Sequence, residues 1–367
     1  MESVKKKSRY KYFLPPVEER GGIYLHRPVY KKILWYLWKF KYCTVDHITA
    51  LLSANLYKEK NMEGEIEQVP TTSIQHNLLS LWENEYIVKR VTNSKSKTRA
   101  GSDKDIWQLA EKGASFLAES EGIFIEQVHY PKLPNTSKPH SGEPTGEYDF
   151  LKHNLLITDT IVAFHVFCAL SKKHEIVYFE PDTTRKYSFA VPEGNFFIRP
   201  DGLIILEGND KNGKKARLNF FLEIDRSTET LGDFQKKLIS YFHLKKNEKQ
   251  ISFFEEIYQE ETIPVLEEVP ESSFKHMRVL TLTTSPKRVL NMVKSTYPIF
   301  NDKTGSMLFC FTSIEKFLPL SERVEVLNKE GSKKYKKIKI LFENVSKVGS
   351  DIWNIGSIKV TKPSSIL

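Results

Sequence analysis

Two segments near the middle of the chain carry carboxylates where the interior of a β-sheet normally holds apolar side chains. In FFIRPDGLIIL, Asp201 lies between a proline and a glycine, and in LNFFLEIDR strand alternation puts Glu223 and Asp225 on one face. Buried carboxylates are costly unless they are paired or bound to a cation. The pattern therefore predicts a sheet with a metal-binding cluster of Asp201, Glu223 and Asp225, and such oxygen ligands favour Mg²⁺ or Mn²⁺.

A helix is predicted to follow the second of these strands. Lys237 and Tyr241 are four residues apart in it and therefore share one face. A lysine beside a metal-bound water orients that water and stabilises the charge that grows on a phosphate during hydrolysis. Tyr241 is a candidate nucleophile, or else a tyrosine packed at the helix edge. His153, on an earlier predicted helix, is either a catalytic residue or a histidine packed against the sheet.

Helix and strand signals are mixed around these segments, as expected for an α+β fold. Periodicity predicts a long helix at 148–171 and then three strands, at 175–180, 196–206 and 216–225. A second helix is predicted at 233–245 and a buried strand at 278–284. Residues rich in Pro, Ser, Gly and Asn precede the first helix and indicate a linker.

The N-terminal third has the pattern of a winged helix-turn-helix, with three helices followed by a basic β-hairpin. Its third helix would enter the major groove of DNA, where glutamine and asparagine side chains read adenine edges. Lysines and arginines on the hairpin would contact phosphates. The candidate DNA-binding residues are Ser73, Gln75, His76, Asn77, Lys89, Arg90, Lys95, Lys97 and Arg99.

The charge distribution supports a polyanionic partner for this N-terminal part. The formal net charge is +9, and residues 1–50 hold eleven Lys or Arg against four acids. The three cysteines are too widely spaced for a disulfide framework or a cysteine-rich zinc site. Because no apolar run approaches the length of a membrane span, we expect a cytoplasmic protein without membrane insertion.

The motifs RPDG, FFLEIDR and KKLISY resemble the signature of the replication-relaxation family, over roughly residues 25–300. The resemblance implies an N-terminal winged helix followed by a restriction-endonuclease-like α/β domain of the PD-(D/E)xK type. Asp201 then matches the aspartate of the PD element, and Glu223 matches the acid of the ExK element. Asp225 occupies the place of the usual lysine, so Lys237 is taken as its replacement.

With this resemblance, the sequence predicts a sequential organisation along the chain. The parts are a basic flexible arm at 1–22, a winged-helix domain at 23–119, a linker at 120–147, a nuclease-like domain at 148–320 and a basic C-terminal extension at 321–367.

The resemblance implies a relaxase of a plasmid or other mobile element that binds origin DNA and nicks one strand with a divalent metal ion. Its partners would be double-stranded and nicked or single-stranded DNA and a conjugative coupling protein, and a homodimer is left open. The alternative is a non-catalytic origin-binding replication or regulatory protein with a degenerate nuclease-like domain. A third reading, a repressor with a ligand-sensing domain, would require an apolar pocket in place of the acidic strands.

Overall fold

The chain divides into two compact units. Unit 1 comprises Met1–Leu56 and Glu67–Thr158, and unit 2 comprises Tyr57–Ile66 and Asp159–Leu367. The computed structural model describes residues 10–13, 25, 27–62, 66–92, 105–131, 147–181, 186–209, 213, 215–226, 229–246, 254, 277–296, 308–313, 324–326, 333–335, 341–348 and 352–359.

Unit 1 contains the helices expected in the N-terminal third. Helix α1 (Pro28–Phe40) has proline in its first turn, where the fixed φ of proline suits a helix start. Helix α2 (Val45–Glu59) follows Thr44, whose hydroxyl accepts a hydrogen bond from the backbone N–H of His47 at 3.3 Å. Helix α3 (Thr71–Glu83) buries one apolar stripe, formed by Ile74, Leu78 and Leu81.

A small antiparallel sheet completes unit 1. Its strand order is β1-β4-β5-β2, with bounds Tyr10–Phe13, Ile87–Thr92, Ile106–Leu109 and Cys43–Thr44. Strand β1 falls in the segment predicted to be a flexible arm, and its pairing with β4 corrects that prediction. Helix α4 (Glu111–Glu121) and the short helix η1 (Ile125–Gln127) follow, so the predicted linker begins with ordered structure.

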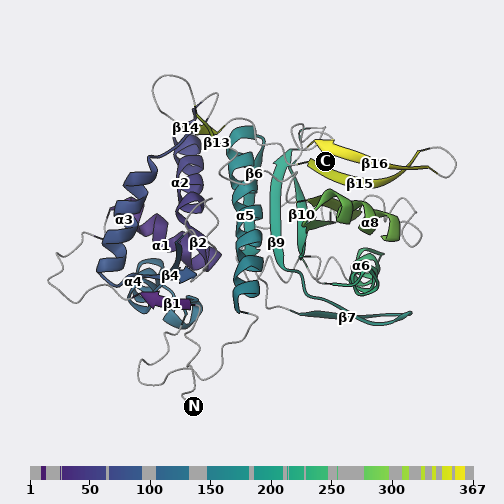
Figure 1. Cartoon of the computed structure of the whole chain (residues 1–367), viewed down its shortest axis with the longest axis horizontal. Coiled ribbons are helices and arrows are strands. Elements are labelled where there is room, and N and C mark those ends of the chain that lie inside the picture. The colour runs from purple at the N-terminus through teal and green to yellow at the C-terminus, as the bar shows by residue number, and fades with distance from the viewer. Residues whose placement is uncertain are drawn as a thin grey trace, which may run out of the picture. The chain divides into compact units, whose positions relative to one another are not determined.

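A seven-stranded mixed sheet is the centre of unit 2 (Figure 1). Strands β10, β11 and β12 run parallel to one another, and the other pairings in the sheet are antiparallel. In sheet order the strands are β16 (Ile352–Lys359), β15 (Leu341–Val348), β12 (Phe309–Ser313), β11 (Met277–Thr283), β10 (Lys215–Asp225), β9 (Gly202–Asn209) and β6 (His174–Pro181). The segment predicted to be a C-terminal extension therefore contributes two strands to this sheet.

Among the described helices, α5, α6 and α8 cover the two faces of the sheet. Helix α5 (Glu147–Ser171) packs on one face, where the rings of Phe164 and Phe220 lie 5.4 Å apart. Helices α6 (Leu231–Lys246) and α8 (Pro286–Thr296) pack on the other face (Figure 1). The fully buried residues of that second face include Phe221, Phe234 and Phe311. Apolar burial on both faces explains why the central strands are almost continuously hydrophobic.

The strand predicted at 196–206 is two strands. Strand β8 (Gly194–Ile198) pairs with β7 (Tyr187–Val191) in a separate hairpin, and β9 starts again at Gly202. Asp201 lies between them, where the chain passes from the hairpin into the sheet. The remaining short strands are β3 (Ile66–Glu67), β13 (Val324–Val326) and β14 (Lys333–Tyr335).

Helix α5 contains a segment, Leu151–Ser171, that is long and apolar enough to cross a membrane. By that measure, the prediction that no segment approaches a membrane span is corrected. However, 67% of the most apolar window of this segment is buried inside the protein. This burial fits a core helix, because a helix that is packed on most sides is hydrophobic nearly all round.

Candidate functional site

The first carboxylate of the site is placed by the junction between β8 and β9. Gly202 pairs with Leu222 across β9 and β10, which brings the preceding Asp201 beside Glu223. The Asp201 backbone N–H donates to the Leu222 carbonyl at 2.9 Å, and the Ile224 N–H donates to Asp201 Oδ2 at 2.7 Å. These bonds hold the aspartate at the start of β9, next to the second carboxylate.

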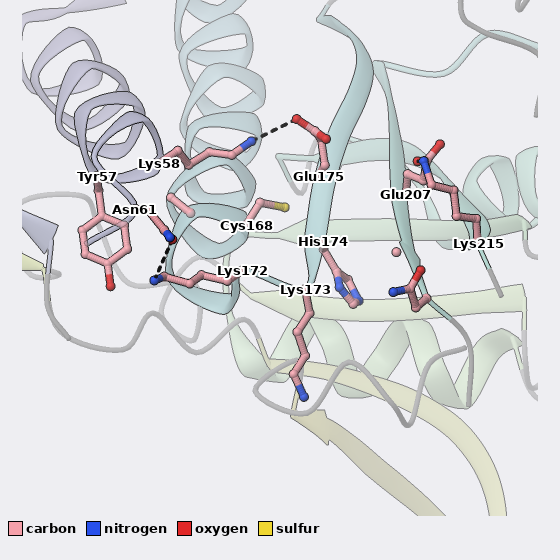
Figure 2. A pocket seen from close by; sticks show the side chains of 13 residues that line it. Tyr57, Lys58, Asn61, Cys168, Lys172, Lys173, His174, Glu175, Glu207 and Lys215 are labelled. Carbon is pink, nitrogen blue, oxygen red and sulfur yellow. Dashed lines mark hydrogen bonds and ion pairs between the residues drawn. The ribbon is translucent and has the colours of Figure 1, made fainter. Parts of the chain in front are cut away.

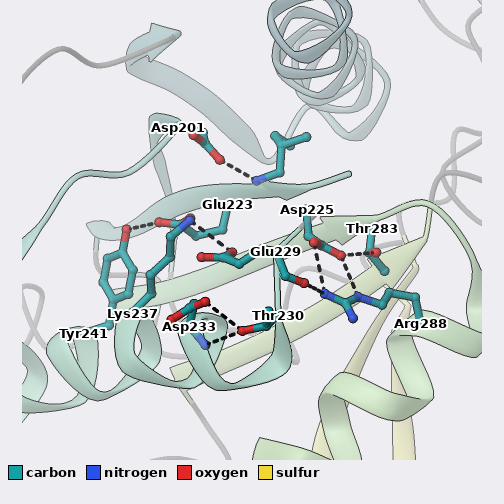
Figure 3. Close-up of polar contacts among 11 residues, drawn as sticks. Asp201, Glu223, Asp225, Glu229, Thr230, Asp233, Lys237, Tyr241, Thr283 and Arg288 are labelled. Carbon is teal, nitrogen blue, oxygen red and sulfur yellow. Dashed lines mark hydrogen bonds and ion pairs between the residues drawn. The ribbon is translucent and has the colours of Figure 1, made fainter. Parts of the chain in front are cut away.

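Glu223 lies on the face of β10 that α6 covers, and its side chain is buried. The Tyr241 hydroxyl donates to Glu223 Oε1 at 2.5 Å, and Lys237 Nζ donates to Glu223 Oε2 at 3.4 Å (Figure 3). Lys237 remains 45% exposed at its side chain, so the cluster has one solvent-facing cation. The structure thus brings together Asp201, Glu223, Lys237 and Tyr241, as the sequence predicted.

Glu229 also belongs to this cluster, although it was missed in the sequence. Its carboxylate lies 3.3 Å from Lys237 Nζ. It lies just before α6, where the Thr230 hydroxyl accepts a hydrogen bond from the Asp233 N–H at 3.2 Å. The sequence signal was this helix-capping pattern, which places the preceding residue near the first turn of the helix that carries Lys237.

Asp225 does not join the other two carboxylates, and the predicted metal-binding cluster of three is corrected. Its carboxylate accepts hydrogen bonds from Arg288 Nε at 3.0 Å, from Arg288 Nη2 at 3.3 Å and from the Thr283 hydroxyl at 2.7 Å. Strand alternation does put Asp225 on the face of Glu223. However, it is two residues further along β10, beside the end of β11 and the first turn of α8. Asp225 is therefore part of a buried ion pair.

His153 is the remaining predicted catalytic residue. It is on α5, in the part of that helix assigned to unit 1, whereas the cluster belongs to unit 2. Among the described residues, no group of three or more His, Cys, Asp or Glu side chains is arranged to hold a metal ion.

Burial and neighbouring charges set the protonation states in the cluster. Burial, followed by the negative charge of Asp201, raises the pKa of Glu223 from 4.5 to about 8, against the opposing effects of Lys237 and Tyr241. Burial and the charge of Glu223 raise the pKa of Tyr241 well above its usual value. Burial alone would lower the pKa of Lys237, but the attraction of Glu223, Glu229 and Asp201 raises it. Lys237 is therefore a cation, and Tyr241 keeps its proton and donates a hydrogen bond to Glu223.

The raised pKa of Glu223 predicts a pH-dependent stability in the absence of metal. Between pH 4.5 and about 8, the folded chain keeps a proton that the unfolded chain releases. The free energy of unfolding should therefore fall as pH rises through this window. Urea denaturation in EDTA at several pH values measures this slope. It should be smaller in a Glu223→Gln variant, and equal slopes in the two proteins would contradict the assignment.

The predicted DNA-binding residues of unit 1 fall into three groups. Ser73, Gln75 and His76 are exposed on α3, and Asn77 is half-buried there. Lys89 forms an ion pair with Asp105 at 2.7 Å, with its Nζ 5.6 Å from the centre of the Trp107 ring, so it also has a structural role. Arg90 lies in β4, whose pairing with β5 agrees with the predicted hairpin. The tip residues Lys95, Lys97 and Arg99 lie outside the described residues.

Comparison with known proteins places the chain in a family. A family model described as replication-relaxation matches residues 34–256, which is more than half of the 367 residues. The chain belongs to the replication-relaxation family. No curated protein and no solved structure matches it. The match includes α3 of unit 1 and Asp201, Glu223, Lys237 and Tyr241 of unit 2, and it ends before β11 and α8.

This replication-relaxation protein also has a hollow in unit 2 that is separate from the carboxylate cluster (Figure 2). Its volume is about 370 Å³ and its lining includes Lys58, Lys172, Lys173, His174, Glu207 and Lys215. Three of these lysines contact polar side chains: Lys58 contacts Glu175 at 3.1 Å, Lys215 contacts Glu207 at 2.8 Å, and Lys172 contacts Asn61 at 3.3 Å. The contacts of Lys58 and Lys172 connect the last turn of α2 and the residues after it to β6 and to the end of α5, and the contact of Lys215 joins β10 to β9.

Proposed function

We propose that the chain binds origin DNA of a plasmid or other mobile element through unit 1 and nicks one strand at the carboxylate cluster of unit 2. One observation carries this proposal. Asp201, Glu223 and the charged Lys237 converge where the start of β9 lies beside the last residues of β10. Two acids on adjacent strands and a nearby lysine, here supplied by α6, are the groups that a PD-(D/E)xK nuclease needs. In this reading unit 1 is a winged helix, and the protein works in the cytoplasm.

The donor set fits a hard divalent cation such as Mg²⁺ or Mn²⁺. Asp201 and Glu223 offer oxygen ligands only, and Mg²⁺ is often held by one or two carboxylates together with waters and substrate phosphates. The raised pKa of Glu223 reflects first its burial and then the charge of the nearby Asp201 carboxylate, and a bound cation would offset both effects. When bound, the cation would polarise the phosphate and activate a water molecule.

Lys237 supplies the positive charge that Asp225 cannot. It reaches Glu223 from α6 with its side chain partly open to solvent, so its ammonium can face a phosphate oxygen. A fixed cation there stabilises the negative charge that develops as the phosphodiester bond breaks. Tyr241 holds the Glu223 carboxylate in place through its hydroxyl.

Unit 1 would supply recognition of the DNA. Ser73, Gln75 and His76 are exposed on α3, on the side away from the buried Ile74 and Leu78. This separation suits a helix that lies in the major groove. The basic residues of the β4–β5 connection would contact phosphates and make the affinity fall with salt. A conjugative coupling protein is the expected protein partner.

A second function, a non-catalytic origin-binding protein, is favoured by the contacts of the cluster itself. The position of the usual catalytic lysine holds Asp225, which is paired with Arg288. In addition, Lys237 is shared between Glu223 and Glu229. These interactions would also stabilise a nuclease-like domain that has lost its activity.

Nicking of supercoiled plasmid carrying the native origin distinguishes the two functions. With Mg²⁺ or Mn²⁺ the protein should convert supercoiled plasmid to open circles, and EDTA should prevent this. Lys237→Ala should reduce the rate by about a hundredfold, because a positioned charge on the phosphate is lost. Lys236→Ala is the matched control, since Lys236 is 78% exposed and pairs with Asp233. Origin binding without nicking in any metal would support the non-catalytic function.

A further inference from the structure

The β7–β8 hairpin has one face fixed to unit 2. The Phe189 and Phe196 rings are stacked 6.1 Å apart, and Phe196 stacks on His243 of α6 at 4.3 Å with an interplanar angle of 24°. Ile198, at the end of β8, is buried in the core that α6 and α8 cover. The hairpin is therefore anchored on the helix that also carries Lys237 and Tyr241.

The other face of the hairpin is aromatic and basic. Phe197 is 53% exposed, although a phenylalanine of a folded domain is usually buried. Lys186 Nζ lies 3.9 Å from the centre of the Phe197 ring, and Arg199 is exposed after β8. The one acid within residues 186–199 is Glu193, and its carboxylate lies 3.9 Å from His243 on α6. This outward face suits a ligand that has both a flat apolar surface and a negative charge.

The hairpin leads directly into the carboxylate cluster. Phe197 precedes Asp201 by four residues, a distance of at most about 14 Å along an extended chain. A DNA strand whose phosphate lies at Asp201 and Glu223 would therefore have a base within reach of Phe197. A base within a duplex keeps both faces stacked on its neighbours, so only an unpaired base can present a face to this ring.

We infer that Phe197 stacks with an unpaired base of the DNA strand held at the carboxylate cluster, while Lys186 and Arg199 contact its phosphates. This inference rests on the proposed function, because that function supplies the strand. The base replaces the Lys186 ammonium over the ring, and the flexible lysine moves to a neighbouring phosphate. Stacking of this kind is tolerant of sequence, because every base has a flat face.

Binding of a short labelled single strand and of the matching duplex tests the inference. The full-length chain carries Glu223→Gln to prevent cleavage, and affinities are measured by fluorescence anisotropy. Adding Phe197→Ala should weaken single-strand binding about tenfold and duplex binding by less than roughly twofold. Phe197→Tyr should retain most of the single-strand affinity, because the ring is kept. Phe124→Ala is the matched control, because Phe124 is another exposed phenylalanine (77%) that lies in unit 1.

Four outcomes would overturn the inference. The first is that the protein shows no measurable binding to the single strand, and the second is that Phe197→Ala leaves the affinity unchanged. The third is that Phe197→Ala weakens single-strand and duplex binding equally. The fourth is that Phe197→Ala changes the oligomeric state and not the affinity. The last result would make Phe197 part of a protein interface. Because binding is measured without cleavage, a failure of this inference can be distinguished from a failure of the proposed nicking function. Selective loss of single-strand binding in a protein that never nicks plasmid would support the hairpin inference and reject the nickase.

Discussion

The Glu223→Gln variant is expected to lose metal-dependent nicking by about a thousandfold or more, because a metal ion contributes several kcal/mol of charge stabilisation in the transition state. A neutral amide keeps the shape of the carboxylate and its contact with Tyr241 but holds a divalent cation poorly. The same change removes a buried charge that costs stability above neutral pH. The variant should therefore be less active and, in EDTA at alkaline pH, at least as stable as the wild type.

Plasmid nicking and urea denaturation measure these two effects on the same protein samples. Glu175→Gln is a suitable control, since Glu175 lies on β6 of the same sheet with a side chain that is 63% exposed. It should change neither property. Nicking by Glu223→Gln at a rate close to that of the wild type would reject Glu223 as a metal ligand and move cleavage to another site.

Replacing Arg288 by alanine is expected to lower the free energy of unfolding by about 3–5 kcal/mol, because it leaves the buried Asp225 carboxylate without its ionic partner. The side chains of Asp225 and Arg288 are only 2% and 17% exposed. Arg288 Nη2 also donates to the Glu229 carbonyl at 2.7 Å. The substitution should therefore loosen the segment before α6 as well, and with it the carboxylate that pairs with Lys237.

Urea denaturation of Arg288→Ala measures this loss, with Lys287→Ala as the control because Lys287 is its exposed neighbour on α8. The double variant Asp225→Leu/Arg288→Met should recover most of the lost stability, since apolar side chains of similar volume can replace a buried ion pair. A loss below about 1 kcal/mol in Arg288→Ala would indicate an ion pair that behaves like one on the surface.

Local periodicity was enough to predict much of the candidate site. The alternation of β10 put Glu223 and Asp225 on one face, and the spacing of Lys237 and Tyr241 put both on one helix face. Both relations hold in the structure, because they depend only on the repeat of a strand or a helix. The start of α2 after Thr44 and the apolar stripe of α3 are equally local features, since their causes lie within a few residues.

Pairings between distant segments were not readable in the same way. Arg288 is 63 residues after Asp225 and no periodic signal connects them, so the aspartate looked like a metal ligand. The break between β8 and β9 was also hidden, because both strands are apolar and only their pairing separates a hairpin from the sheet. Strands β15 and β16 were read as an extension for a similar reason.

The family, the mixed α+β composition and the residues that carry charge into the sheet could all be recognised from the order of the amino acids. Which of these charges meet depends on how the chain packs. A buried carboxylate is stable only when it has a partner. Helix α6 packs Lys237 and Tyr241 against Glu223, and helix α8 packs Arg288 against Asp225. Periodicity specifies the direction of a side chain, whereas the nearest opposite charge depends on which helix the folded chain packs above it.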